Sequence, residues 1–338
     1  MRHRIVVAAC CVAAAGVLVI GRARAGNCSD AVNPCINDDA LWPHAGPSQF
    51  VALGAADTVA RGQIGFALVT SYLSRPVVLH LASPGLAAGG TDHNVVDDLV
   101  DGTFLWSYGV TNRLELDIAL PLAFGQGGTG LAPVTAGPGL NDTAVRDTRF
   151  GVAYAILPRA RVSPDAGPDS TLAGLAPRSV LGIVGRFEVS APTGDADQFA
   201  GERAGVLLPS VVGDFRFGRF FGEAEAGARL RPIHRWLDTA VGSQLVAALG
   251  VGYGFLPRER LSGNLEAWVL PTFGGPGIAM TPAEWQLSVR SAPLPGGDLS
   301  VQLGGGGGIP FGGDLPVTTP RFRFTLSVRW APLARVSP

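Results

Sequence analysis

The five histidines are the first candidates for chemistry, because histidine acts as a general base or a metal ligand near neutral pH. They are His3, His44, His80, His93 and His234. No H-E-x-x-H zinc spacing and no G-x-S-x-G nucleophile elbow occurs in the chain. Ser71 and Ser74 precede His80, which leaves a barrel-surface hydrolase as an alternative. We predict that the chain is not an enzyme and uses no cofactor.

Clustered carboxylates are the second candidates, because oxygen ligands suit the hard cation Ca²⁺. Asp195, Asp197 and Glu202 fall in one predicted loop, and a second acidic group spans 92–101. The first group lacks the spacing of an EF-hand loop. We therefore predict no metal, and we keep these three residues only as candidates.

A run of five glycines at 304–308 could suggest a phosphate-binding loop. Such a loop needs a lysine and a serine or threonine at fixed spacing before a helix. Here Ile309 and Pro310 follow the run, and the chain has no lysine at all. We predict a flexible external loop over 304–319.

Charged side chains that recur at every second position carry the functional content of this sequence. In residues 113–120, Arg113, Glu115 and Asp117 share one face of an extended chain, and leucines and isoleucine share the other. A period of two is the pattern of a β-strand. If the apolar face contacts lipid, the charged face lines a lumen.

The same reasoning assigns seventeen residues to the lumen. The candidates are Arg113, Glu115, Asp117, Arg149, Arg186, Glu188, Asp214, Arg216, Glu223, Glu225, Arg229, Arg231, Glu266, Arg290, Arg321, Arg323 and Arg329. Arginine is in modest surplus, and facing charges in a confined space pair up. Two outcomes stay open: a narrow water-filled channel with mild anion preference, or a charge-bridged interior that is largely closed.

About twelve such strands can be counted, and they predict an all-β, antiparallel transmembrane β-barrel. The predicted strands are 60–73, 95–108, 113–124, 145–157, 178–191, 205–217, 220–232, 243–256, 260–272, 283–293, 298–305 and 320–331. Short turns and long loops alternate between them, except at the long segment 158–177. In outer-membrane barrels the turns on one side of the membrane are short and the loops on the other side are long. Aromatic residues near strand ends, among them Trp106, Phe221 and Trp330, suit interfacial girdles.

The first residues predict export. Arg2 and Arg4 precede the apolar stretch 5–20, and Ala23-Arg24-Ala25 forms a cleavage site before Gly26. Residues 1–25 are therefore the expected signal peptide, and 26–57 an irregular segment with turns. Cys28 and Cys35 are predicted to form a disulfide in this segment, because the compartment is oxidising. The barrel is expected over 58–331 and a tail over 332–338.

The composition fits a membrane barrel. Hydrophobic residues make up 47% and charged residues only 16%, although Gly (47) and Pro (26) are abundant. The net charge of −1 gives no electrostatic reason to bind nucleic acid. Alternation also describes a soluble antiparallel sheet with one face on a core. A secreted β-sandwich that binds a ligand is therefore an open alternative.

Several segments resemble a known family. The stretches DGTFLWSYGVTNRLELDIALPLAF (101–124), GRFEVSAPTGDADQFAGE (185–202) and TTPRFRFTLSVRWAP (318–332) are similar to the outer-membrane barrel domains of myxobacterial and deltaproteobacterial OmpA-family and transporter-like proteins. The resemblance covers about 58–331 and implies an outer-membrane barrel with a transporter-like role. It supplies no catalytic residue, and we expect no C-terminal peptidoglycan-binding domain.

We therefore predict a barrel in the outer membrane of a Gram-negative bacterium that acts as a passive or weakly selective pore for an unknown small solute. Its expected partners are outer-membrane lipid and the barrel-assembly machinery, and we expect no nucleic acid. A structural or adhesive barrel without transport is the alternative within the same fold.

Overall fold

The computed structural model describes residues 33–81, 90–135, 139–158, 181–236, 239–273, 278–294, 298–311 and 315–332. Its wall strands are β1 (Ile64–Leu81), β2 (Thr91–Gly109), β3 (Leu114–Gly127), β5 (Arg149–Leu157), β6 (Leu181–Ser190), β7 (Val206–Phe217), β8 (Phe220–Arg229), β11 (Gln244–Gly254), β12 (Leu261–Val269), β14 (Ala283–Ser291), β15 (Leu299–Gly308) and β16 (Phe322–Trp330). Smaller elements are β4 (Ala144–Val145), β9 (His234–Trp236), β10 (Thr239–Val241), β13 (Ile278–Ala279) and the 3₁₀ helices η1 (Ala196–Gln198) and η2 (Pro257–Glu259). None of the described helices is long and apolar enough to cross a membrane.

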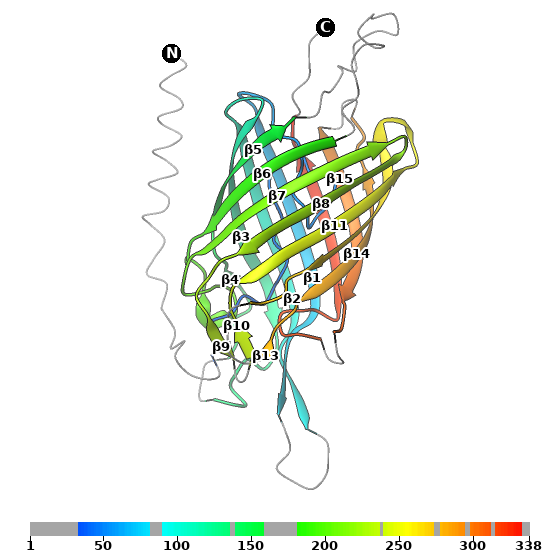
Figure 1. Ribbon diagram of the computed structural model, residues 1–338. Helices are drawn as coiled ribbons and strands as arrows, with labels where there is room; N and C mark the ends of the chain where they lie inside the picture. Colours follow the sequence, from blue (N-terminus) through cyan, green and yellow to red (C-terminus); the bar gives the residue numbers. More distant parts are fainter. Residues whose placement is uncertain are drawn as a thin grey trace, which may run out of the picture.

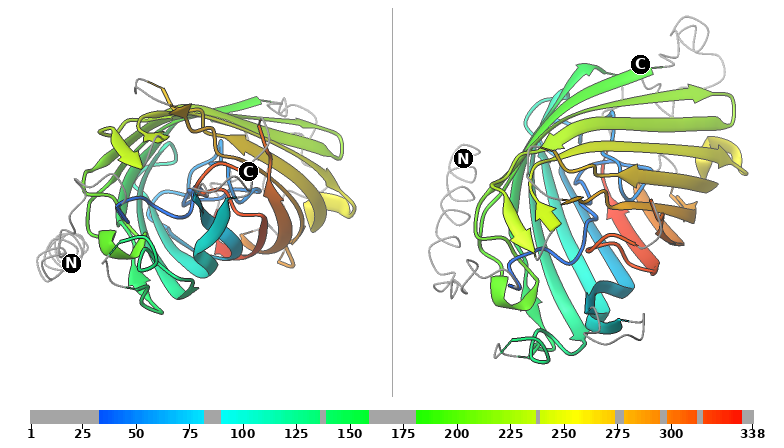
Figure 2. Two further views of the ribbon diagram at one scale, coloured as in Figure 1. Left: turned by 90° about the horizontal axis from the view of Figure 1, so that it is seen from below. Right: turned by 60° about the horizontal axis from the view of Figure 1, so that its bottom comes forward.

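The sheet closes on itself. Every wall strand pairs antiparallel with its neighbours, and β1 pairs with β16 from Phe66↔Trp330 to Ser74↔Phe322. Figure 1 shows the resulting tilted barrel, and Figure 2 shows the same wall along its axis. Closure leaves no unpaired edge, which a sheet in lipid requires. The prediction of an antiparallel barrel of about twelve strands is confirmed, with β4 as one extra strand.

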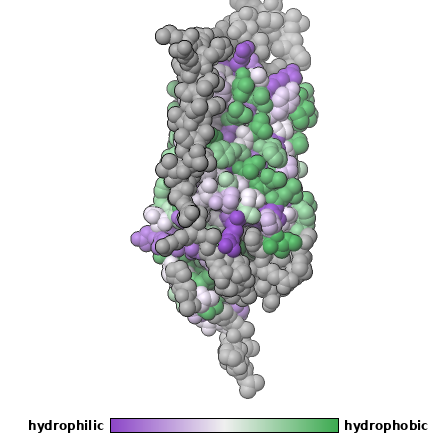
Figure 3. All heavy atoms as spheres, turned by 90° about the vertical axis from the view of Figure 1, so that its left-hand side faces the viewer, coloured by the Kyte–Doolittle hydropathy of each residue, from purple (hydrophilic) through white to green (hydrophobic). Residues whose placement is uncertain are grey.

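Along each strand the polar side chains face the interior and the apolar side chains face outward, the reverse of a soluble protein. We call this arrangement the inside-out wall. In β16, Arg323, Thr325 and Arg329 are buried, whereas the leucine and aromatic side chains between them are exposed. In β14, Glu284 and Gln286 are fully buried and Leu287 is 59% exposed. Figure 3 shows hydrophobic side chains gathered over the middle of one face of the wall. The apolar side chains therefore point away from the interior, and the fold excludes a β-sandwich with an apolar core between two sheets.

The two ends of the barrel differ. Turns such as 110–113 and 218–219 are short, and we call their side the short-turn end. The opposite side, the loop end, carries η1 and the small sheet of β9, β10 and β13. There β1 and β2 extend beyond the wall as a hairpin, which projects at the bottom of Figure 1. In outer-membrane barrels the short turns lie on the periplasmic side. The long 158–177 connection lies almost wholly outside the described residues.

All twelve predicted strands correspond to wall strands, but two local predictions were wrong. The glycines at 304–308 belong to β15 and pair with β14 instead of forming a loop. Glycine is needed there because a Cβ on Gly306 would lie 1.8 Å from the backbone oxygen of Trp285. Phe221, expected at a girdle, points inward and is 3% exposed, since it falls on the lumen side of β8.

Candidate functional site: the plugged lumen

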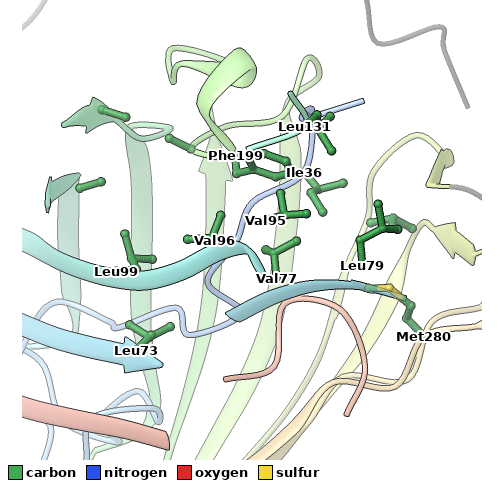
Figure 4. Packing of buried hydrophobic residues seen from close by; sticks show 14 residues of the cluster. Ile36, Leu73, Val77, Leu79, Val95, Val96, Leu99, Leu131, Phe199 and Met280 are labelled. Carbon is green, nitrogen blue, oxygen red and sulfur yellow. The ribbon is translucent and has the colours of Figure 1, made fainter. Parts of the chain in front are cut away.

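The lumen is occupied by residues 33–60, which we call the plug. Figure 2 shows this blue coil crossing the interior of the barrel. At the loop end, Ile36 packs with Val95 and Phe199, as Figure 4 shows, and the amide of Asp38 donates to the oxygen of Phe199. At the short-turn end, the amide of Ala60 donates to Pro332. The plug therefore runs from one mouth of the barrel to the other before β1 begins.

The local sequence explains why the plug is neither helix nor strand. Pro34, Pro43 and Pro47 lack the amide hydrogen that a ladder needs, and Gly46 has a φ of 85°. Short polar side chains bind the backbone two residues away instead. Asn33 Oδ1 accepts from the amide of Cys35, and Asp39 Oδ1 accepts from the amide of Leu41. Such turns are typical of Asn and Asp.

Two arginines, one on a wall strand and one in a loop, hold the acidic start of the plug. Arg323 of β16 donates to Asp39, with 2.5 Å between Nη2 and Oδ1, and also to Glu284 of β14 at 2.7 Å from its Nε. Arg146 lies 2.8 Å from Asp38 Oδ1 and donates to Asp101 at 3.0 Å. All of these side chains are buried, so the pairs are only weakly screened by solvent.

Arg146 and Asp147 lie in the connection before β5, outside the wall strands. The carboxylates of Asp38 and Asp101 outweigh the effect of burial and raise the pKa of Arg146. Burial raises the pKa of Asp147 to about 6, although its two oxygens accept from the amides of Gly194 and Glu202. Asp147 thus ties the 191–205 loop to the mouth of the lumen.

The middle of the plug places an aromatic ring and an imidazole among wall charges. Trp42 lies between the guanidinium groups of Arg149 and Arg229, at 4.6 and 5.0 Å from its ring centre. Its indole nitrogen donates to Glu188. His44 contacts the same carboxylate through Nδ1 at 2.5 Å, and its Nε2 lies 3.4 Å from a Glu225 oxygen.

Wall arginines also bind carbonyl groups of the plug backbone. Arg229 donates to the oxygen of Ala40 at 2.9 Å, Arg149 to that of Pro43 at 3.2 Å and Arg186 to that of Ala45 at 3.3 Å. Arg329 donates to the oxygens of His44 and Gly46. These contacts satisfy buried carbonyls that no ladder reaches.

Wall glutamates accept hydrogen bonds from amide groups of the plug backbone. Glu266 accepts from the amides of Val51 and Ala52, Glu225 from that of Gly54, and Glu115 from that of Val59. Hydrogen bonds to a charged partner are roughly twice as strong as neutral ones. The charged wall therefore takes the place of the missing strand partners of the plug.

Apolar contacts complete the packing around Phe50. Its ring is fully buried and lies 5.8 Å from that of Phe221, measured between centroids. Leu53 and Val51 belong to the same buried cluster. Gly250 leaves room for Phe50, because a Cβ on it would lie 2.7 Å from the ring. The two cavities beside Trp42 measure only about 30 and 20 Å³, room for a water molecule or so.

Most of the predicted lumen residues point inward. Those buried in the interior are Glu115, Asp117, Arg149, Arg186, Glu188, Asp214, Glu223, Glu225, Arg229, Glu266, Arg290, Arg323 and Arg329. Arg216 and Arg231 are half-buried near the two mouths, where they pair with Glu259 and Glu202. Arg113 and Arg321 are exposed, so their assignment was wrong. Each stands one residue before its strand begins, where the inward alternation has not started.

The candidate metal ligands do not form a cluster, and the candidate hydrolase residues lie far apart. Asp195 is exposed and caps the amide of Val145, whereas Glu202 is buried against Arg231. The described residues contain no group of three or more potential metal ligands. His80 pairs with Asp92 at 2.7 Å near the tip of the β1–β2 hairpin. Ser71 is nine residues of extended strand away, roughly 30 Å, and faces inward.

Sequence reasoning missed the plug itself and two acidic wall residues, Asp101 and Glu284. The turn signals at 33–47 showed only that the segment was irregular, and no periodic pattern pointed to a location. Cys35 is buried at the start of the plug. Its predicted partner Cys28 and the signal peptide lie outside the described residues, so both stay predictions.

The comparisons with known proteins concern the fold. No protein-family model and no curated protein matches the chain. An outer-membrane channel from Pseudomonas putida F1 is similar over 83% of this chain and 99% of its own, at 14% identity and a TM-score of 0.54. A FadL homologue from Pseudomonas aeruginosa (89% and 98% covered, 11% identity) and the KdgM porin (79% and 98% covered, 8% identity) have TM-scores of 0.42 and 0.39. The myxobacterial resemblance is not tested by these findings. The chain thus has the fold of an outer-membrane β-barrel.

Proposed function

We propose that this chain is an outer-membrane channel for small solutes, closed in the state described here by its own plug. The observation that carries the proposal is the inside-out wall, with an apolar outer face and a charged interior. Exposed leucines and aromatics suit lipid contact, and the polar interior suits solutes that water can carry. A signal peptide over 1–25 and the barrel-assembly machinery would bring the chain to the outer membrane of a Gram-negative bacterium.

The way in which the plug is held supports a channel that can open. Within the described residues, the plug forms no ladder with a wall strand, and its isolated bridge Asn37↔Ala200 joins it to the loop between β6 and β7. Its other contacts are hydrogen bonds, ion pairs and apolar packing. The plug can therefore shift without breaking a strand pair of the barrel. A shift away from the Arg323 and Glu266 contacts would open a path lined by charged side chains.

The filled lumen favours a second candidate, a structural or adhesive barrel that does not transport. In that case the plug is a permanent core, and the wall charges serve only to satisfy its backbone. The two candidates differ in one measurable property, namely whether ions cross the folded barrel.

Planar-bilayer recordings of the full chain test the proposal. Folding is checked first, by fractionation with the outer membrane and by a gel mobility that changes on heating. Discrete conductance steps are expected, and they should become more frequent in R323Q, which loosens the plug. R321Q, which changes an exposed arginine two residues away, should leave the steps unchanged. Folded protein that gives no steps, with or without R323Q, would favour the structural barrel.

A further inference from the structure

The loop between β6 and β7, residues 191–205, contacts the start of the plug, and we call it the β6–β7 loop. The amide of Asp38 donates to the oxygen of Phe199 at 2.9 Å. Asn37 pairs with Ala200 in an isolated antiparallel bridge. Two consecutive residues of this loop therefore hold two consecutive residues of the plug through backbone contacts.

Phe199 also depends on the plug for its conformation. Its φ of 57° lies in the left-handed region, which a bulky residue rarely adopts. Such a conformation persists only where the surrounding structure enforces it. Phe199 is buried in one apolar cluster with Ile36 of the plug, and Figure 4 shows both in that cluster. Part of this packing is lost if Ile36 leaves, so the loop and the plug stabilise each other's position.

A single carboxylate fixes the two arms of this loop. Asp147 stands two residues before β5 and is buried. Its Oδ1 accepts from the amide of Gly194 and its Oδ2 from the amide of Glu202, both at 2.8 Å. These amides lie on opposite sides of η1 in the loop. Among the described residues, the carboxylate of Asp147 accepts no hydrogen bond from the plug, so its contribution to holding the plug runs through the loop.

The other attachments of the loop are also local. The amide of Asp195 donates to the oxygen of Val145 in β4 at 2.8 Å, and Gln198 Oε1 accepts from the amide of Asn141 at 2.6 Å. Glu202 forms a buried ion pair with Arg231, which follows β8. These contacts can break while the pairing of the twelve wall strands stays intact.

The chain itself decides which end of the plug can move. At the short-turn end the plug continues into β1, and the amide of Ala60 donates to Pro332 at 2.9 Å. At the loop end, residues 36–38 are held by hydrogen bonds, ion pairs and apolar packing. A displacement of the plug that leaves the wall intact therefore begins at the loop end, where the β6–β7 loop holds it.

We infer that the β6–β7 loop is a latch that keeps the plug in the lumen, and that the channel opens when this loop releases residues 36–38. The inference rests on the proposed channel function, whose regulation it describes. Asp147 is the residue that positions the latch. Because the loops opposite the short turns face the outside in outer-membrane barrels, the latch is released from the cell exterior.

The first test weakens the latch without changing the plug. In planar-bilayer recordings of the full chain, D147A removes both acceptors of the loop amides, and conductance steps should become several-fold more frequent than in the unmodified protein. D142A is the matched control, because Asp142 is an exposed carboxylate of the same connection. It should retain the frequency of the unmodified protein. Heat-modifiable mobility shows that each variant is folded.

The second test locks the latch reversibly. Bridge partners have Cα atoms roughly 4.5–5.5 Å apart, a separation that a disulfide spans. N37C/A200C is therefore made in a C28S/C35S background, so that the new pair supplies the only thiols after the expected removal of the signal peptide. Thiol titration verifies that the disulfide forms. The oxidised protein should give few steps or none, and dithiothreitol should restore the frequency of the C28S/C35S reference.

Each outcome decides the inference. Oxidised and reduced N37C/A200C that open equally often would overturn the latch and leave the channel function standing. Equal step frequencies in folded D147A and D142A would also overturn it. If D147A does not fold, the disulfide decides, and the reverse holds for the cysteine variant. Folded protein that gives no steps in the unmodified chain, in D147A and in reduced N37C/A200C removes the channel function, and the latch with it.

Discussion

Arg323 of β16 forms a buried ion pair with Asp39 of the plug, with 2.5 Å between Nη2 and Oδ1. The two residues are 284 positions apart in the chain. The same guanidinium binds Glu284 of β14, so one side chain joins the plug to two of the last three strands of the wall. The pair therefore connects β16, the strand that closes the barrel by pairing with β1, to the plug that fills the lumen.

The variant R323Q should destabilise the folded barrel by about 3–5 kcal/mol, because it leaves two buried carboxylates without their partner. It should also raise the frequency of conductance steps, since the plug loses its contact with β16. Denaturant unfolding in detergent micelles measures the first effect, and bilayer recordings measure the second. R321Q, at an exposed position, should change neither by a measurable amount. An unfolding midpoint for R323Q equal to that of R321Q would contradict the buried pair.

The variant F50A should cost about 3–5 kcal/mol, because it empties a fully buried site between the plug and β8. Phe322 provides a control of the same size, since its ring is 47% exposed on the outer face. F322A loses contact with lipid or detergent but leaves no cavity. We expect a clearly smaller loss of unfolding free energy for F322A. Equal losses would argue against tight packing of the plug.

Two neighbouring glycines of β15 should differ sharply on substitution. In G306A the new Cβ would lie 1.8 Å from the backbone oxygen of Trp285, so the strand must move and β14–β15 pairing should suffer. In G305A the nearest atom would be 3.5 Å away, an ordinary contact. The fraction of protein with heat-modifiable mobility should therefore fall strongly for G306A only. If G306A folded as well as G305A, this run would not be a packed strand.

Asp147 should make the folded state more stable in acid. Burial raises its pKa to about 6, above the ordinary value of 3.8. A raised pKa in the folded state means that the stabilisation is fully present below pH 3.8 and is lost as the pH rises through about 6. D147N mimics the protonated acid, so its unfolding free energy should fall less than that of the unmodified protein between these pH values. D142N is the matched control, because Asp142 is an exposed carboxylate in the connection between β3 and β5. A course for D147N parallel to that of the unmodified protein would refute the role of Asp147.

Alternation made the wall predictable from the sequence. In 113–120 and 320–331, charged and apolar residues alternate with a period of two, and this period decides both the strand and the face that each side chain occupies. The prediction was wrong where local preference competes with packing. Glycine favours loops by itself, but at 304–308 the close approach of β14 requires it in a strand. At Arg113 and Arg321 the pattern was extended one residue beyond the strand.

The sequence by itself determined the strands and their two faces, because neighbouring residues carry that information. Only the tertiary structure decided where the barrel closes and what fills it. The β1–β16 pairing joins Phe66 to Trp330, and His44 meets Glu188 from 144 positions away. The plug has no period, and its prolines and glycines specify only that it is irregular. Its place in the lumen arises because its backbone groups find partners on many strands, which become neighbours only once the wall has closed.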